Sequence, residues 1–189
     1  MTPQITTDLS NIQVWDDLID DRFLLDLDEE SNKYPWTLTN VANRKSFPYK
    51  KKGSHLFWGV DIPLDNVPKN IEKLYHYIID EVIGHPFKLN IIQLNGQSLG
   101  QNGAVHIDNL QGTGEKTLMV FISYKWQTEW GGSFQILKEY NNNSEVIKNI
   151  EYIPGRIILF DGNLPHRGLA PLEPYVIRKS LVFRLGKYE

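Results

Sequence analysis

The second half of the chain consists of short β-prone runs separated by turn residues, and this pattern constrains the fold more than any other feature. Turn dipeptides separate the runs, among them Asn95-Gly96, which is typical of a two-residue hairpin, and Pro154-Gly155. Short strands without helices between them predict a β-sandwich or barrel, of which the double-sheet jelly roll is one form. The runs are Leu89–Leu94, Ala104–Ile107, Thr117–Tyr124, Ser133–Leu137, Val146–Ile153, Arg156–Phe160 and Val176–Leu185.

The first half of the chain contains two segments with the spacing of amphipathic helices. Residues 20–32 place Leu24 and Leu27 on one side and acidic residues elsewhere. Residues 68–83 carry apolar side chains at helical spacing, and Gly84 follows as a stop signal. We therefore expect helices that pack on the outside of a β core, in an α+β, mainly β fold.

Composition narrows the classes of function. The 189 residues suit one domain, and the absence of cysteine excludes disulfides, thiolate metal sites and iron–sulfur clusters. A net charge of −3 gives no electrostatic reason to bind nucleic acid or an anionic membrane. The N-terminus lacks the pattern of a secretory signal, and no apolar stretch approaches the ~18 residues that span a bilayer. We expect a cytoplasmic protein for which a monomer is sufficient.

Two histidines and one aspartate form a candidate metal site. His106 and Asp108 are separated by one residue at the end of a β-prone run, so both side chains lie on the same face of a strand. His166 follows another predicted strand. Two histidines and one carboxylate are the ligands of non-haem iron(II) oxygenases, and three protein ligands leave metal positions open. Taken alone, His106 could equally be a surface residue, and Asp108 could cap a turn.

The last predicted strand carries a candidate anion site. Alternation along Val176–Leu185 places Arg178, Ser180 and Arg184 on one face. A buried arginine needs an anionic partner, and a guanidinium beside a hydroxyl is a good receptor for a carboxylate. The alternative is a solvent-exposed face on which both arginines are simply hydrated.

Together these motifs resemble a known family. The stretch from about Lys88 to Leu185, about half of the chain, resembles the prolyl-4-hydroxylase-like group of the 2-oxoglutarate/Fe(II) dioxygenase superfamily. The elements occur in the same order and at similar spacing. The matching pieces are Gly103–Asn109, Thr117–Ser123, Trp126, Trp130–Phe134, Pro154–Phe160, His166, Arg178 and Ser180.

The resemblance implies a fold and a set of ligands. It implies a double-stranded β-helix, that is, a jelly-roll core, in a single domain over residues 1–189. Residues 1–87 would supply helical support and substrate-side loops, and residues 88–189 would form the core. It also implies that iron(II) is held by His106, Asp108 and His166. Arg178 would bind the distal carboxylate of 2-oxoglutarate, and Ser180 would assist.

The resemblance also implies a reaction. With O2 as the second cosubstrate, the enzyme would hydroxylate a C–H bond and release succinate and CO2. The substrate would be a peptidyl proline, another amino-acid-like compound or a small molecule. Relatives often use ascorbate to rescue oxidised iron, so ascorbate is a further candidate cofactor. Asp108 favours hydroxylation over halogenation, because related halogenases lack this carboxylate.

Some features depart from the family pattern. Relatives often place a tyrosine near the cosubstrate where this chain has Phe121, and Tyr124 and Asn95 are candidates for the missing contact. Arg178 and Arg184 also resemble a pair in nucleic-acid dealkylases, but the slightly acidic chain disfavours that substrate.

Three further interpretations come from the same residues. A cupin-like isomerase or lyase would generally use more histidines and a glutamate. A non-catalytic jelly-roll module would bind a sugar or a peptide without a metal. For the basic segment Arg44–Lys52, the sequence favours a solvated surface loop over a lid that covers the substrate.

Overall fold

The computed structural model describes residues 9–40, 56–109, 114–141 and 143–188, and it is mainly β. The basic segment Arg44–Lys52 lies outside the described residues. The helices are η1 Leu9–Asn11, α1 Asp21–Ser31, α2 Lys69–His76, the π-helix η3 Tyr77–Ile83 and η4 Thr128–Trp130. The strands are β1 Ile12–Trp15, β2 Thr37–Asn40, β3 Phe57–Ile62, β4 Lys88–Gln97, β5 Lys116–Phe121, β6 Phe134–Leu137, β7 Val146–Ile150, β8 Ile157–Asp161, β9 His166–Gly168 and β10 Arg178–Gly186.

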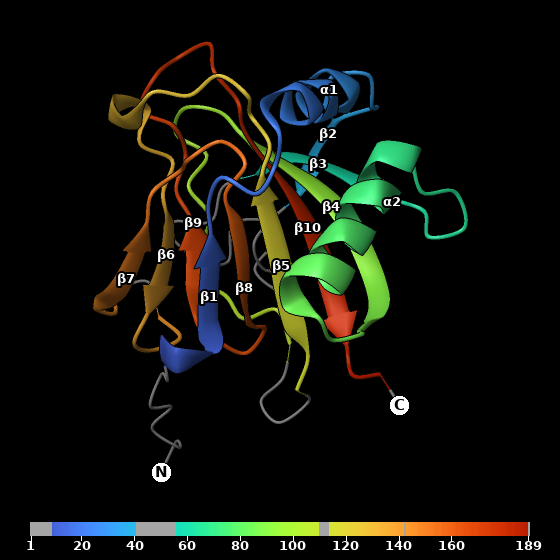
Figure 1. Cartoon of the computed structure of the whole chain (residues 1–189). Helices are drawn as coiled ribbons and strands as arrows, with labels where there is room; N and C mark the ends of the chain where they lie inside the picture. Colours follow the sequence, from blue (N-terminus) through green and yellow to red (C-terminus); the bar gives the residue numbers. More distant parts are fainter. Residues whose placement is uncertain (1–8, 41–55, 110–113, 142, 189) are drawn as a thin grey trace.

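The strands form two antiparallel sheets that face each other (Figure 1). The large sheet has the order β1-β8-β5-β10-β4-β3-β2, and the small sheet has the order β7-β6-β9. Neighbouring strands are often far apart in sequence, as with β10 between β4 and β5. This two-sheet arrangement is the expected jelly roll.

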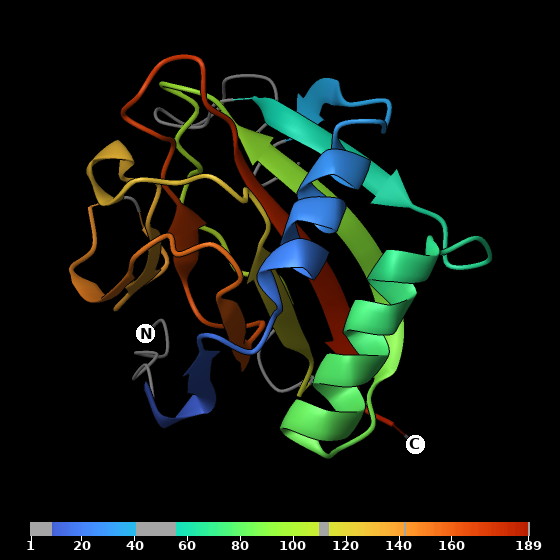
Figure 2. The same cartoon turned by 45° about the horizontal axis from the view of Figure 1, so that its top comes forward.

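Helices α1 and α2 lie across one face of the large sheet (Figure 2). Asp20 caps α1, because its carboxylate accepts hydrogen bonds from the backbone N–H groups of Arg22 and Phe23. The second predicted helix is formed by α2 and the π-helix η3 that continues it, and it ends at Gly84, whose φ of 67° suits glycine. Both predicted helices are confirmed. None of the helices in the described ranges is long and apolar enough to cross a membrane.

Strand β10 separates two apolar cores. Leu181 and Phe183 face the helices, whereas Val182 belongs to the core between the sheets. The predicted alternation along this strand is therefore confirmed, and its arginine face lies between the two sheets.

Buried Lys179 links β10 to helix α1. Its ammonium forms an ion pair with Asp28 and donates hydrogen bonds to Ser31 Oγ at 2.7 Å and Asn32 Oδ1 at 2.9 Å. A buried cation is tolerated only with such partners. These contacts therefore hold α1 against β10 at the residue next to Arg178.

The structure differs from two expectations. Residues 1–87 contribute the strands β1, β2 and β3 to the large sheet, in addition to helices. The Asn95-Gly96 dipeptide forms no hairpin and continues β4, with β3 on one side and β10 on the other. A Cβ on Gly96 would lie 3.0 Å from a ring carbon of Trp36, so this glycine allows close packing rather than a turn.

Candidate metal and cosubstrate site

The backbone brings the three predicted metal ligands together. His106 and His166 exchange two backbone hydrogen bonds of 3.0 and 2.9 Å, and the N–H of Asp108 donates to the carbonyl of Gly162 at 2.7 Å. The run Ala104–Ile107 was expected to be a strand, but it contributes only this isolated bridge. One potential ligand atom from each of the three side chains lies within 4.8 Å of the other two.

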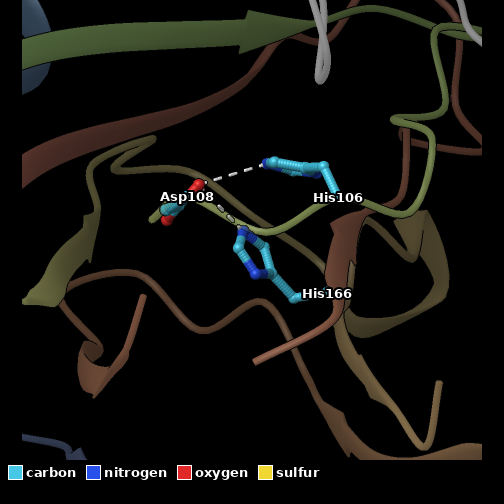
Figure 3. A group of neighbouring side chains, drawn as sticks. All are labelled: His106, Asp108 and His166. Atoms are coloured by element: carbon cyan, nitrogen blue, oxygen red, sulfur yellow. Dashed lines mark ion pairs between the residues drawn. The ribbon is translucent and has the colours of Figure 1, made fainter. Parts of the chain in front are cut away.

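Both imidazoles present the same nitrogen to Asp108 (Figure 3). His106 Nδ1 lies 3.0 Å from the carbonyl oxygen of Ala104, and His166 Nδ1 lies 2.7 Å from that of Leu164. A carbonyl only accepts hydrogen bonds, so Nδ1 carries the proton and Nε2 carries a lone pair.

Both histidines are held in the neutral form that metals bind. Burial lowers the pKa of His166 to about 4. Burial, followed by the nearby His166, lowers the pKa of His106 well below its ordinary value.

The two oxygens of Asp108 have different surroundings. The side chain is only 1% exposed, and Oδ2 accepts a hydrogen bond of 2.6 Å from Thr117 Oγ1 and pairs with the guanidinium of Arg184. Oδ1 lies 3.5 Å from His106 Nε2 and 3.4 Å from His166 Nε2, yet it has no hydrogen-bond partner within the described part of the chain. A buried carboxylate oxygen without a partner is costly, and a cation between the three groups would satisfy it. The residues therefore fit a divalent metal.

A pocket extends from these ligands to the arginine face of β10. It is formed by both sheets and by the segment that carries the ligands. It is lined by Phe57, Asn95, Gln97, Gly103, His106, Asp108, Thr117, Met119, Phe134, Phe160, His166, Gly168, Arg178, Ser180, Val182 and Arg184.

Arg178 is a buried cation, and one nitrogen of its guanidinium is available to a ligand. Its Nε donates to the carbonyl of Gly132 at 2.6 Å, and its Nη1 donates to Gln97 Oε1 at 3.2 Å. The guanidinium lies 4.9 Å from the ring centre of Phe121 and 5.2 Å from that of Tyr152. Nη2 is buried without a partner among the described residues. Burial lowers the pKa of Arg178 to about 10, so the side chain remains charged at neutral pH. The pocket therefore suits an anion.

The two candidates for the missing tyrosine contact lie in different places. Phe121 stacks on Tyr152, but the Tyr152 hydroxyl donates to the carbonyl of Lys179 at 2.5 Å instead of facing the pocket. Tyr124 packs against the core beneath the helices and does not line the pocket. Asn95 does line it, and its Oδ1 accepts a hydrogen bond from Asn40 at 2.7 Å.

Sequence reasoning missed several residues that contact the predicted ones. Gln97 contacts Arg178 across two strands that are distant in sequence, and Thr117 contacts Asp108, which precedes its strand, so no local pattern indicated either contact. Gly132 lies in the matching piece Trp130–Phe134, but the hydrogen bond that its carbonyl accepts from Arg178 was not predicted. Arg184 was noted, although its ion pair with Asp108 was not predicted.

A second pocket adjoins the first and shares Phe57, Asn95, His106, Asp108 and Arg184 with it. Polar side chains, many of them amides, account for much of its wall. Its lining residues are Asn40, Phe57, Asn90, Ile91, Gln93, Asn95, His106, Ile107, Asp108, Asn109, Glu115, Arg184 and Leu185.

No protein-family model matches the sequence, and no curated protein matches it. Several solved structures, however, are similar to this one in fold. A prolyl-4-hydroxylase from Pseudomonas putida is 12% identical, with a TM-score of 0.64 over 95% of this chain and 94% of that one. A 2OG-Fe(II) oxygenase family protein from Burkholderia pseudomallei is 13% identical, with a TM-score of 0.68 over 96% of this chain and 87% of that one. HygX from Streptomyces hygroscopicus, with nickel and 2-oxoglutarate bound, is 12% identical, with a TM-score of 0.67 over 94% and 83%. The chain therefore has the fold of the 2OG-Fe(II) oxygenases, with the double-stranded β-helix core that the sequence led us to expect.

Proposed function

We propose that this protein is an Fe(II)- and 2-oxoglutarate-dependent dioxygenase that hydroxylates a C–H bond. One observation carries the proposal: a single pocket contains a carboxylate oxygen of Asp108 between two neutral histidines and a guanidinium nitrogen of Arg178, and neither buried atom has a hydrogen-bond partner among the described residues. The first group calls for a cation and the second for an anion. A dicarboxylate that also chelates a metal satisfies both requirements.

In this proposal His106, Asp108 and His166 hold the iron. When bound, iron supplies the chemistry that couples O2 and 2-oxoglutarate to C–H hydroxylation, with release of succinate and CO2. Three protein ligands leave coordination positions open for the cosubstrates.

The other residues of the pocket bind the cosubstrate and exclude water. Arg178 presents Nη2 to the distal carboxylate of 2-oxoglutarate, and the Ser180 hydroxyl lines the same pocket. Met119, Phe134 and Phe160 form apolar walls, which strengthen the ionic contact by keeping water out.

In this proposal the second pocket, which shares His106 and Asp108 with the first, receives the substrate. Its amide side chains both donate and accept hydrogen bonds, which suits a polar substrate. Because one protein of similar structure is a prolyl-4-hydroxylase, we include a peptidyl proline among the amino-acid-like substrates to be tested. The buried Arg178 disfavours a cupin-like isomerase or lyase, which does not need a deep arginine, and the triad of candidate metal ligands disfavours a non-catalytic module.

The test is an anaerobic titration of the protein with Fe(II) and 2-oxoglutarate, followed by visible absorbance. Chelation of the 2-oxo acid should produce a weak metal-to-ligand charge-transfer band. We expect His166→Ala to abolish the band and Arg178→Ala to require much more 2-oxoglutarate. Asp108→Ala should weaken iron binding and abolish turnover while the protein remains folded.

Arg167→Ala is the matched control for the arginine variant. Arg167 lies next to His166 in sequence, but its guanidinium donates to Gln135 and does not line the pocket. Its band should match that of the wild type. Folded wild-type protein that gives no band would refute the proposed function.

A further inference from the structure

Gln97, the last residue of β4, is a buried amide whose side chain makes three hydrogen bonds. It is 4% exposed. Nε2 donates to the carbonyls of Gln101 at 2.7 Å and Gly168 at 3.1 Å, and Oε1 accepts from Arg178 Nη1 at 3.2 Å. These contacts fix both the position of the amide and the direction of its oxygen.

The amide oxygen restricts the orientation of Arg178. The guanidinium is a rigid plane, and it is held on one edge by Gly132 and on another by Gln97. The ring of Phe121 lies over it. Nη2 has no hydrogen-bond partner in the described part of the chain, so it is available to a ligand.

The absence of charge on the Gln97 side chain matters for anion binding as much as its position does. An amide oxygen accepts a hydrogen bond without neutralising the arginine, so the positive charge stays available for an anion. A glutamate of the same shape would pair with Arg178 and compete with any carboxylate.

Gln97 also connects Arg178 to the strand that begins with His166. The carbonyl that it contacts belongs to Gly168, at the end of β9. A Cβ on Gly168 would lie 2.9 Å from Gln97 Oε1 and 3.5 Å from Arg178 Nη1. Glycine at this position therefore allows β9 to approach both side chains.

From these contacts we propose that Gln97 is the positioning residue that sets Arg178 for the distal carboxylate of the cosubstrate. It thereby selects 2-oxoglutarate over 2-oxo acids that lack this carboxylate. The inference rests on the proposed function, because it takes Arg178 to be the cosubstrate receptor.

The experiment compares 2-oxoglutarate with pyruvate, which chelates a metal through the same 2-oxo acid group but has no distal carboxylate. Affinity for each is measured anaerobically on Fe(II)-loaded protein by the charge-transfer band. Gln97→Met should weaken 2-oxoglutarate binding about tenfold, the size of one hydrogen bond. Gln97→Glu should weaken it more, on the order of 100-fold, because the new carboxylate occupies Arg178. Neither variant should change the affinity for pyruvate or Fe(II).

Two controls separate positioning from packing. Gln135 also accepts a hydrogen bond from an arginine, but it lies outside the pocket, so Gln135→Glu should leave both affinities unchanged. In an Arg178→Met background, Gln97→Met should have no further effect on 2-oxoglutarate, because the amide acts through the arginine.

The outcomes distinguish this inference from the proposed function. If Gln97→Glu binds 2-oxoglutarate as the wild type does, the inference is wrong even though the wild-type band establishes the function. If Gln97→Met weakens pyruvate or Fe(II) binding as strongly as 2-oxoglutarate binding, Gln97 has a structural role and the inference also fails. A wild-type protein without any band would overturn the proposed function itself.

Discussion

The hydroxyl of Thr117 should set the metal affinity of the site. It donates to Asp108 Oδ2 at 2.6 Å and accepts from Arg184 Nη1 at 3.1 Å, so it bonds to both members of the Asp108–Arg184 ion pair. Thr117→Val removes the hydroxyl and retains the β-branched shape in strand β5. The change therefore tests the hydrogen bonds without opening a cavity.

The structure gives the size of the effect. A hydrogen bond to a charged group contributes about 1.5–3 kcal/mol, and the short distance from Thr117 to the Asp108 carboxylate places it in this class. Without that bond, Oδ2 keeps its ion pair with Arg184 but loses a hydrogen bond, and Oδ1 is held less firmly opposite the two histidines. We expect metal affinity to fall by about 10–100-fold, the range for outer partners of metal ligands.

The assay is an anaerobic titration with Co(II), read by its visible absorbance, so no turnover is needed. Thr117→Ser keeps the hydroxyl and should stay close to the wild type. The reasoning would be refuted by a Thr117→Val protein that binds Co(II) with wild-type affinity. It would also fail if Thr117→Ser lost as much affinity as Thr117→Val.

Two further predictions concern stability. Lys179→Met leaves Asp28 without its cation, so it should lower the free energy of unfolding by about 3 kcal/mol. Adding Asp28→Asn should restore part of this stability, and denaturant titration measures both effects. Co(II) at about 100 times its dissociation constant should raise the free energy of unfolding by about 2.7 kcal/mol, and His106→Ala should abolish this gain in a thermal shift assay. A Lys179→Met protein of unchanged stability, or equal protection of the His106→Ala protein, would contradict these expectations.

The sequence predicted the structure well where the regular alternation of side chains along a strand decides which face each residue occupies. Alternation along β10 placed Arg178 and Ser180 on one face and Phe183 on the other, and the structure has this arrangement. The spacing of His106 and Asp108 likewise put both side chains on one side of the chain, although the segment forms only a bridge.

Partners across strands could not be predicted in the same way. Thr117 meets Arg184, and Gln97 meets Arg178, because strands far apart in sequence are neighbours in the fold. The Asn95-Gly96 dipeptide was misread for the same reason: pairing on both sides of β4 overrides a local turn preference.

The charges in the pocket imply that metal and cosubstrate bind together. Both histidines are neutral, so the charged side chains that line it among the described residues are Arg178, Arg184 and Asp108, with one positive charge in excess. A divalent metal alone would add two positive charges to this buried site, and the dicarboxylate alone would add two negative ones. Bound together they leave the charge unchanged, so each should strengthen the binding of the other. Co(II) titrations with and without 2-oxoglutarate measure this coupling, and we expect a tighter metal in its presence. Equal Co(II) affinities in the two titrations would show that the buried charges do not govern assembly of the site.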